Sequence, residues 1–314
     1  MDFKGANILS TRQFEKADIE RVIEVAEELE PIAKKEQTSD LMKGKVLASL
    51  FYEASTRTRL STETAMKRLG GEVITVIGEE YSSLKKGETL DDTGRIISCY
   101  ADVMAMRHSE EGAVDKFADG ATVPVINCGD GPGQHPTQAL LDIFTIKKEL
   151  GKLDGLTVAM SGDLKFGRTV HSLVYLLRHF DMKLVFIAPD QLKMPENIIK
   201  DLKNDGVEVE ETADFTEGVK KADFFYATRV QQERFEDPSE YEKLKDVYVL
   251  TKKFVEDNNP DLVISHPLPR VGEITKDVDE LKGAAYFRAA ANGVAVRMAL
   301  IALVTGVTGV LGVK

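Results

Sequence analysis

The arrangement of apolar runs along the chain is the feature that most restricts its fold. Short apolar runs alternate with stretches whose apolar residues recur at helical spacing, and this rhythm occurs twice within the 314 residues. Apolar runs separated by helices are typical of parallel strands buried on both faces of a sheet. The sequence therefore predicts an α/β protein with two similar domains, each a parallel sheet flanked by helices. The predicted strands are 46–51, 73–77, 103–106, 123–127, 156–160, 184–188, 224–227 and 262–265.

Proline and glycine mark the expected ends of several helices. The first helix carries apolar residues at helical spacing and is predicted to end at Pro31. A second begins near Pro136, after the glycine-rich loop 129–133, and is predicted to end at Gly151. We place the domain boundary near this helix. A final helix is expected from about Ala284.

Composition excludes several classes of protein. With 43% hydrophobic residues the chain can bury a core, and its net charge of −11 argues against nucleic acid as a partner. The most apolar stretch, 289–304, is interrupted by Arg297 and is shorter than the roughly 20 residues that cross a bilayer, so no membrane span and a cytoplasmic location are expected. Cys99 and Cys128 lie outside any C-x-x-C pattern, which predicts two buried thiols rather than a disulfide or zinc site.

The segment S-T-R-T-R, residues 55–59, follows the first predicted strand and begins a helix. Ligands of parallel sheets bind beyond the carboxyl ends of the strands, where a helix N-terminus offers N–H groups and partial positive charge. Ser55 alone could serve only as a helix cap, but two arginines in a first turn oppose the helix dipole and favour a bound anion. Neither a P-loop nor a G-x-G-x-x-G fingerprint is present, so the sequence predicts the phosphate of a small molecule.

Four other polar clusters occupy similar positions. Residues 81–88 form a loop with two lysines, Arg107 ends a predicted strand, and His135 precedes a helix. The segment 266–270 ends the last strand, and its prolines stiffen a turn whose carbonyl groups can face a ligand. Each cluster alone is typical of a surface loop or a helix cap.

Seven motifs taken in order make the chain closely similar to the aspartate carbamoyltransferases of the aspartate/ornithine carbamoyltransferase family. The resemblance covers nearly the whole chain. It implies transfer of the carbamoyl group from carbamoyl phosphate to L-aspartate in de novo pyrimidine biosynthesis, with no metal and no organic cofactor. The motifs are S-T-R-T-R (55–59), S-S-L-K-K-G-E (82–88), M-R-H (106–108), H-P-T-Q (135–138), G-D-L-K-F-G-R-T (162–169), T-R-V-Q (228–231) and H-P-L-P-R (266–270).

The resemblance also implies a domain organisation and an assembly. Residues 1–134, completed by a C-terminal helix over 285–314, would bind carbamoyl phosphate, and residues 150–284 would bind aspartate. The active site would open at the cleft between the domains. A homotrimer with active sites shared between subunits is implied, and a separate regulatory chain is left open.

Site residues follow from the resemblance residue by residue. The expected catalytic residues are Arg57, Thr58, Arg107, His135 and Lys86; the first four would stabilise the negative charge that grows on the carbamoyl oxygen. Carbamoyl phosphate would be bound by Ser55, Thr56, Arg57, Thr58, Ser82, Arg107, His135, Gln138 and the carbonyl groups of Leu268 and Pro269. Aspartate would be bound by Lys86, Arg168, Arg229 and Gln231. Ser82, for which Ser83 is an alternative, and Lys86 would come from a neighbouring subunit.

Three other functions fit these residues less well. Ornithine carries a cationic amine and one carboxylate, whereas Arg168 and Arg229 suit a dicarboxylate; ornithine carbamoyltransferases also have a cysteine where this chain has Pro267. A nicotinamide-dependent oxidoreductase is compatible with the fold, but its fingerprint is missing. A non-catalytic relative would not need a competent residue at every catalytic position. The chain departs from the family pattern at Phe166, in the loop before Arg168. Relatives have tyrosine at this position, and phenylalanine lacks the tyrosine hydroxyl.

Overall fold

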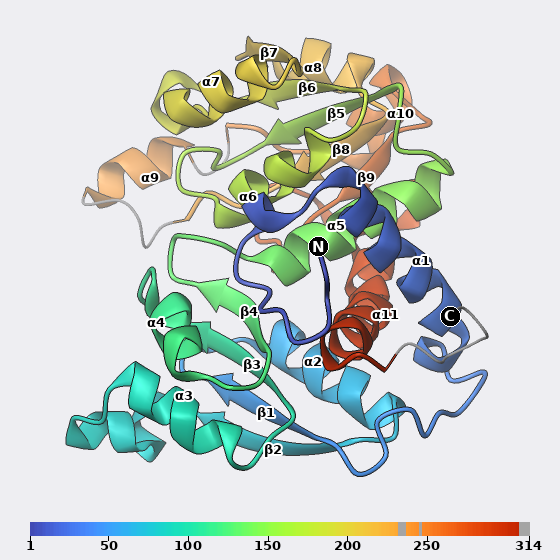
Figure 1. Cartoon of the computed structure of the whole chain (residues 1–314). Coiled ribbons are helices and arrows are strands. Elements are labelled where there is room, and N and C mark those ends of the chain that lie inside the picture. The colour runs from blue at the N-terminus through green and yellow to red at the C-terminus, as the bar shows by residue number, and fades with distance from the viewer. Residues whose placement is uncertain (232–236, 245–246, 308–314) are drawn as a thin grey trace. The chain divides into compact units, whose positions relative to one another are not determined.

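The computed structural model describes residues 1–231, 237–244 and 247–307. The chain forms two compact units, each built on a parallel sheet (Figure 1). Unit 1 comprises Met1–Phe144 and the chain from Ala290 onward, and unit 2 comprises Thr145–Ala289. The predicted fold class, with two parallel sheets flanked by helices, is confirmed.

Unit 1 holds a four-stranded parallel sheet in the order β2-β1-β3-β4. Because every strand runs in the same direction, all their carboxyl ends lie at one edge of the sheet, and Arg107 is aligned with Phe51, the last residue of β1. The strands are β1 (Val46–Phe51), β2 (Glu72–Ile77), β3 (Val103–His108) and β4 (Val125–Asp130).

The helices of unit 1 cover this sheet with apolar side chains. Phe117 of α4 is fully buried in a core cluster that also contains Leu50 and Met104 from the strands. The helices are α1 (Lys16–Ala33), α2 (Thr56–Arg68), α3 (Leu90–Ser98) and α4 (Ala113–Gly120), with parts of α5 (Pro136–Leu150) and α11 (Tyr286–Thr305).

Unit 2 holds a five-stranded parallel sheet in the order β7-β6-β5-β8-β9. Its strands are β5 (Leu156–Ser161), β6 (Met182–Ile187), β7 (Glu208–Thr212), β8 (Phe224–Ala227) and β9 (Val263–Ser265). Its helices are α6 (Arg168–Leu177), α7 (Glu196–Asn204), α8 (Phe215–Lys221), α9 (Pro238–Leu244) and α10 (Lys252–Asn258).

Several expectations from the sequence need correction. Pro31 lies inside α1, which continues to Ala33. A proline removes one N–H donor, and in the last turn of a helix this loss does not prevent the helix from continuing for two residues. The last helix stops at Thr305, where Gly306 adopts a φ of +71°, and residues 308–314 lie outside the described part. The strand expected at 123–127 begins at Val125 and continues to Asp130. Cys128 is buried as expected, but Cys99 is exposed.

One helix within the described residues, Tyr286–Thr305, is long and apolar enough to cross a membrane. In this structure 67% of its most apolar window is buried. That degree of burial is typical of a core helix in a folded domain.

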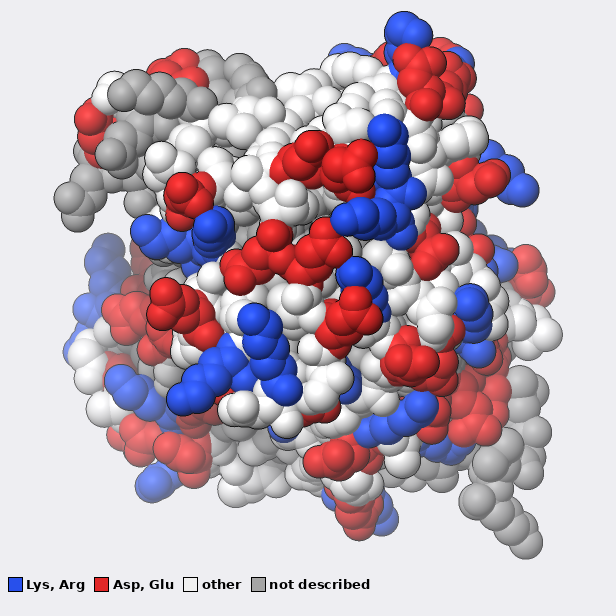
Figure 2. Space-filling model, turned by 90° about the horizontal axis from the view of Figure 1, so that it is seen from above, with Lys and Arg blue, Asp and Glu red and all other residues white. Residues whose placement is uncertain are grey.

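Charged side chains are interspersed on the surface. Figure 2 shows a face on which Lys and Arg lie next to Asp and Glu, without a continuous basic patch among its described residues. Within unit 2, Lys183 lies 2.8 Å from Glu208 and 2.9 Å from Glu210, and Lys221 lies 2.8 Å from Glu210. An acidic chain of this kind needs a local concentration of arginines to bind an anion.

We predict that Phe117→Ala lowers the free energy of unfolding by about 3–5 kcal/mol, because it leaves a cavity in a fully buried cluster. Phe287→Ala is the matched control: this side chain is 57% exposed, and a change of about 0.5 kcal/mol is expected. Urea denaturation of both variants measures the difference. Equal losses would contradict the assigned core.

Candidate functional site

The N-terminus of α2 lies directly beyond the carboxyl end of β1 and has no capping side chain. Ser55 occupies the cap position in an extended conformation, with a φ of −158°, and its side chain makes no cap hydrogen bond. No acidic residue lies in the first turn. The interpretation of Ser55 as a simple cap is therefore wrong. The helix presents N–H groups and partial positive charge at the edge where ligands of parallel sheets bind.

Two arginines converge on this helix start. Arg57 lies in its first turn, and burial together with the positive charge of Arg107 holds the pKa of the Arg57 guanidinium below its usual value. Arg107 is 9% exposed, and its Nε lies 2.9 Å from Oε2 of Glu53. Exposed Arg57 and buried Arg107 are like charges near a helix N-terminus, and a bound dianion would relieve their repulsion. Arg59, by contrast, pairs with Glu63 one turn later at 3.9 Å.

His135 is buried immediately before α5, and its surroundings favour one tautomer. Its Nδ1 lies 3.4 Å from Oγ1 of Thr137. Arg297, fully buried in α11, donates to the same Oγ1 at 3.3 Å. Because a guanidinium can only donate, the Thr137 hydroxyl accepts from Arg297 and can turn its own proton toward Nδ1. When Thr137 donates to Nδ1, the neutral His135 ring carries its proton on Nε2, where it can donate to a ligand oxygen.

Gln138 lies on the first turn of α5. Its NH₂ group donates to both carboxylate oxygens of Asp142, at 3.0 and 3.1 Å. This arrangement directs the Gln138 amide oxygen away from Asp142, as an acceptor for an N–H group of a ligand.

The loop 81–88 follows β2 at the edge of the unit 1 sheet. Ser82 Oγ donates to the carbonyl oxygen of Glu79 at 2.8 Å, and Lys86 is exposed. Glu79 also lies 3.1 Å from Nε2 of His108. Within one chain, therefore, the Ser82 hydroxyl is directed to its own loop rather than to the start of α2.

In unit 2, hydrogen bonds to Asp163 join two loops that carry predicted aspartate-binding residues. Asp163 accepts from the backbone N–H of Phe166 at 2.9 Å and from the side-chain amide of Gln231 at 3.2 Å. A Cβ on Gly162, whose φ is +108°, would lie 1.9 Å from the carbonyl oxygen of Thr228. This close approach lets Arg168, the first residue of α6, and Arg229, just beyond β8, project from adjoining segments.

The segment 266–270 continues from β9 in an unusual conformation. Leu268 has a φ of +58° and precedes a cis peptide bond to Pro269. The backbone N–H of Leu268 donates to Nδ1 of His266 at 2.7 Å. Arg270 donates to Asp279, at 2.7 Å for one of its nitrogens, and to the hydroxyl of Tyr286 at 2.8 Å.

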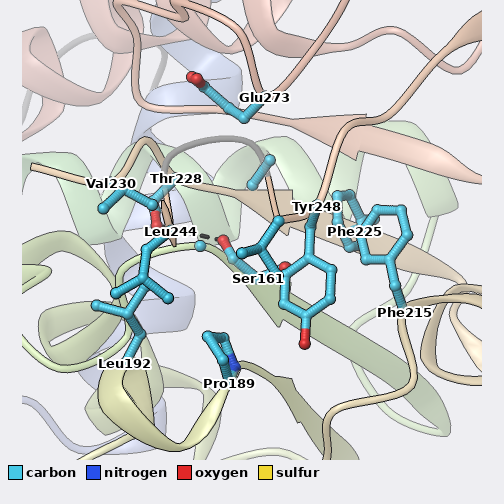
Figure 3. A pocket seen from close by; sticks show the side chains of 13 residues that line it. Ser161, Pro189, Leu192, Phe215, Phe225, Thr228, Val230, Leu244, Tyr248 and Glu273 are labelled. Atoms are coloured by element: carbon cyan, nitrogen blue, oxygen red, sulfur yellow. Dashed lines mark hydrogen bonds between the residues drawn. The ribbon is translucent and has the colours of Figure 1, made fainter. Parts of the chain in front are cut away.

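A small cavity lies within unit 2, beside the carboxyl ends of β5 and β8 (Figure 3). Ser161, Thr228, Val230 and Glu273 contribute to its lining, together with aromatic and aliphatic side chains. Its volume is about 20 Å³, enough for roughly one water molecule and too small for a substrate. Among the described residues, no cluster of three or more metal-ligating side chains is present.

Five residues around these positions were not singled out from the sequence: Glu53, Thr137, Asp163, Glu273 and Arg297. Their partners lie far away in the sequence or across a loop, and only Asp163 and Thr137 lie inside a recognised motif. The one local signal was a polar residue two positions after the end of a strand, as for Glu53.

We predict that inorganic phosphate binds the start of α2 and that Arg57→Ala weakens it by about 10- to 100-fold, the value of one lost charge-assisted hydrogen bond. Arg59→Ala removes the same charge two residues away, where the side chain pairs with Glu63, and should change the affinity by less than about threefold. Isothermal titration calorimetry at constant ionic strength measures both. Equal weakening would indicate a general charge effect and no specific site.

Comparisons with known proteins identify the family of the chain. Residues 6–148 match the carbamoyl-P binding domain of the aspartate/ornithine carbamoyltransferase family, and residues 154–304 match its Asp/Orn binding domain. The catalytic subunit of aspartate carbamoyltransferase from Leptospira biflexa is 50% identical over 97% of this chain and 98% of its own length. The corresponding subunit from Thermococcus kodakarensis is 50% identical over 99% and 100% of the two chains.

Solved structures give the same result. The catalytic subunit of M. jannaschii aspartate transcarbamoylase is 47% identical, with a TM-score of 0.88 over 94% of this chain and 96% of its own. Aspartate transcarbamoylase from Trypanosoma cruzi, solved in complex with carbamoyl phosphate, is 39% identical, with a TM-score of 0.91 over 96% of both chains. Both halves of the sequence and both sheets are thus accounted for by one family. The chain belongs to the aspartate/ornithine carbamoyltransferase family.

Proposed function

We propose that this chain transfers the carbamoyl group of carbamoyl phosphate to the amine of L-aspartate, giving N-carbamoyl-L-aspartate and phosphate. In the cell this reaction belongs to de novo pyrimidine biosynthesis. The observation that carries the proposal is the uncapped start of α2, with Arg57 and Arg107 beside it, on a chain that is 50% identical to aspartate carbamoyltransferase subunits.

The donor half of the proposed site lies mainly in unit 1. Backbone N–H groups at the start of α2 and the hydroxyls of Ser55, Thr56 and Thr58 hold the phosphate, and Arg57 neutralises its charge. The other proposed contacts polarise or orient the carbamoyl group. Arg107 and the Nε2–H of His135 donate to the carbamoyl oxygen. The carbamoyl NH₂ donates to the side-chain oxygen of Gln138 and to the carbonyl oxygens of Leu268 and Pro269.

The acceptor half requires recognition of two carboxylates. Arg168 and Arg229 project from segments joined through Asp163, and an arginine can bind a carboxylate through two parallel hydrogen bonds. Gln231 and Lys86 complete the proposed aspartate contacts. Ornithine has one carboxylate and a cationic side chain that these cations would repel, and Pro267 stands where ornithine carbamoyltransferases have cysteine.

In the proposed reaction the neutral amine of aspartate attacks the carbamoyl carbon, and a C–N bond forms as the carbonyl oxygen gains negative charge. Arg57, Thr58, Arg107 and His135 stabilise this charge. The C–O bond to phosphate then breaks, and phosphate leaves with the proton that the attacking nitrogen gives up. The departing phosphate acts as the base, so no side chain is assigned that role.

Self-association is part of the proposal, since Ser82 and Lys86 are assigned to a neighbour's site. β2 forms an edge of its sheet and is exposed along both faces, with Ile74 43% and Ile77 49% exposed. Tyr81, in the following loop, is 82% exposed. Apolar side chains at a sheet edge support an interface between copies of the chain. A homotrimer with shared active sites is the proposed assembly, and a regulatory chain stays open.

The first test is phosphate release from carbamoyl phosphate by the purified chain, with L-aspartate and then L-ornithine as acceptor. Release that depends on aspartate and yields N-carbamoyl-L-aspartate is expected. Arg229→Ala should raise the KM for aspartate by about 10- to 100-fold, because a charge-assisted hydrogen bond is lost. Turnover with ornithine alone would refute the assigned acceptor.

The shared site is tested by mixing two variants. Arg57→Ala and Lys86→Ala should each be inactive as pure proteins. After dissociation and reassembly of an equal mixture, roughly a quarter of the sites should contain both intact residues by random association. Recovery of about that fraction of wild-type activity is expected; two variants that stay inactive after verified subunit exchange would exclude a site composed in this way.

A further inference from the structure

His266 directly follows the last residue of β9 and makes two close contacts, one at each ring nitrogen. It is 3% exposed. Its Nδ1 receives the backbone N–H of Leu268 at 2.7 Å, and its Nε2 lies 2.7 Å from Oε1 of Glu273. A backbone N–H always donates, so Nδ1 carries no proton, and the proton of the neutral ring lies on Nε2, the nitrogen beside the carboxylate.

Leu268 depends on this support because of its backbone conformation. A φ of +58° is disfavoured for a residue with a side chain, so this conformation persists only where the surroundings hold it. The bond from its N–H to Nδ1 of His266 fixes the plane of the preceding peptide. Because the direction of the Leu268 carbonyl group is set by that plane together with φ and ψ of Leu268, the bond helps to direct the carbonyl group.

Glu273 connects this histidine to the following loop. Its carboxylate also accepts from the backbone N–H groups of Val271 at 3.2 Å and Gly272 at 3.1 Å. Burial alone would raise the pKa of Glu273, but its contact with His266 and the backbone N–H groups of Gly272 and of Glu273 itself outweigh burial and hold the pKa below its usual value. The carboxylate is therefore charged at neutral pH.

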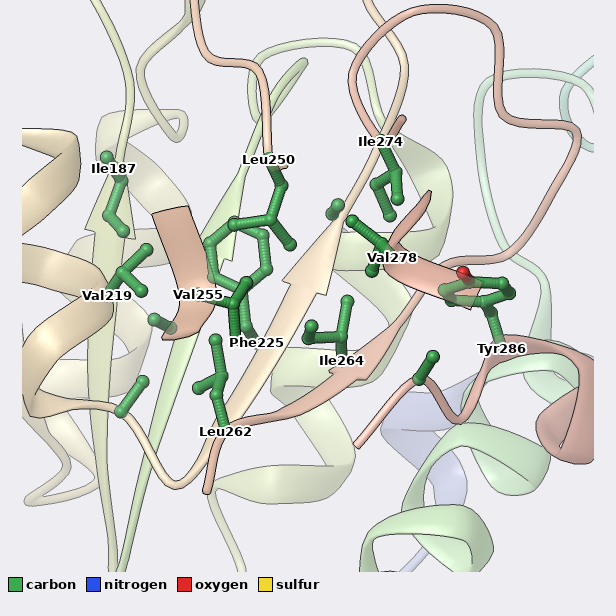
Figure 4. Close-up of a cluster of buried hydrophobic side chains, with 14 of the residues drawn as sticks. Ile187, Val219, Phe225, Leu250, Val255, Leu262, Ile264, Ile274, Val278 and Tyr286 are labelled. Carbon is green, nitrogen blue, oxygen red and sulfur yellow. The ribbon is translucent and has the colours of Figure 1, made fainter. Parts of the chain in front are cut away.

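The base of the segment is anchored in the core of unit 2. Figure 4 shows Tyr286 in the same buried cluster as Ile264 of β9 and Val278. Arg270 donates to the Tyr286 hydroxyl and to Asp279, so its charge is directed to those groups. With both ends held in this way, the orientation of the turn at Leu268 depends on His266.

We propose that His266 is a positioning residue for carbamoyl transfer: supported by Glu273, it aims the Leu268 carbonyl oxygen at the NH₂ of the carbamoyl group. This inference rests on the proposed function and deepens it. The support exists in the neutral, Nε2-protonated ring alone. A second proton on Nδ1 would face the Leu268 N–H, break that bond and release the carbonyl.

A dependence on pH follows. Activity is present while the His266 ring is neutral and is lost when a falling pH protonates it, because only the neutral ring accepts from Leu268. Glu273 is a charged group in contact with the ring and favours its protonated form; Arg270 donates to Asp279 and Tyr286. Removing the charge of Glu273 should therefore shift the acid limb of the rate profile to lower pH.

Two amide variants separate the contacts of His266. In His266→Asn, the amide oxygen occupies the position of Nδ1 and can still accept from Leu268. In His266→Gln, the amide nitrogen reaches the position of Nε2 and can still donate to Glu273, while the acceptor for Leu268 is lost. We expect kcat to fall less than about tenfold in His266→Asn and about 10²-fold in His266→Gln, the loss typical of a misplaced contact group.

The pH profiles of the wild type, His266→Asn and Glu273→Gln complete the test. The acid limb due to His266 should be absent in His266→Asn and lie at lower pH in Glu273→Gln, while the KM for aspartate stays within about twofold. Thermal unfolding of each variant identifies any that does not fold.

Equal losses of kcat in folded His266→Asn and His266→Gln, or an unchanged acid limb in His266→Asn, would overturn the positioning role. Failure of the wild-type chain to form N-carbamoyl-L-aspartate would instead overturn the proposed function. The two failures are therefore distinguishable.

Discussion

The start of α2 is the feature on which the donor half of this protein depends. It combines an uncapped helix N-terminus with two arginines, one of which is depressed in pKa by burial and by the other's charge. Such an arrangement favours an anion, because two like charges, one of them on a buried side chain, lie near the positive end of a helix. The parallel sheet makes it possible: the alignment of Phe51 with Arg107 brings the end of β3 beside the loop that leads into α2. A bound phosphate would reduce the repulsion between the two guanidinium groups.

In unit 2, hydrogen bonds restrain the loops that carry the proposed aspartate-binding residues. Asp163 uses its two oxygens to accept from Phe166 and Gln231, so it restrains the segments that present Arg168 and Arg229. The segment 266–270 is held in the same way by His266 and Arg270. In an acidic chain with a net charge of −11, cations thus act locally, at the ends of strands, while surface lysines pair with carboxylates.

The sequence allowed the fold class and much of the candidate site to be predicted, and the failures have physical causes. The strand Val46–Phe51 agrees residue for residue, because a buried strand is a continuous apolar run. The edge strand Glu208–Thr212 was missed because three of its five residues are glutamates, which a buried run does not contain. Glu53, Glu273 and Arg297 were missed because their roles arise from neighbours distant in the chain or across a turn. The loop 81–88 and Arg168 were found through motifs rather than through periodicity.

The central claim is that the proposed phosphate-binding and aspartate-binding residues serve one reaction. Calorimetric binding of a phosphonate joined to L-aspartate through an acetyl group, to the wild type, Arg57→Ala and Arg229→Ala, tests it most directly. The account predicts that the joined compound binds at least about 10²-fold more tightly than either of its parts, and that each substitution weakens it. Affinity equal to that of the phosphonate alone, unchanged by Arg229→Ala, would contradict the account.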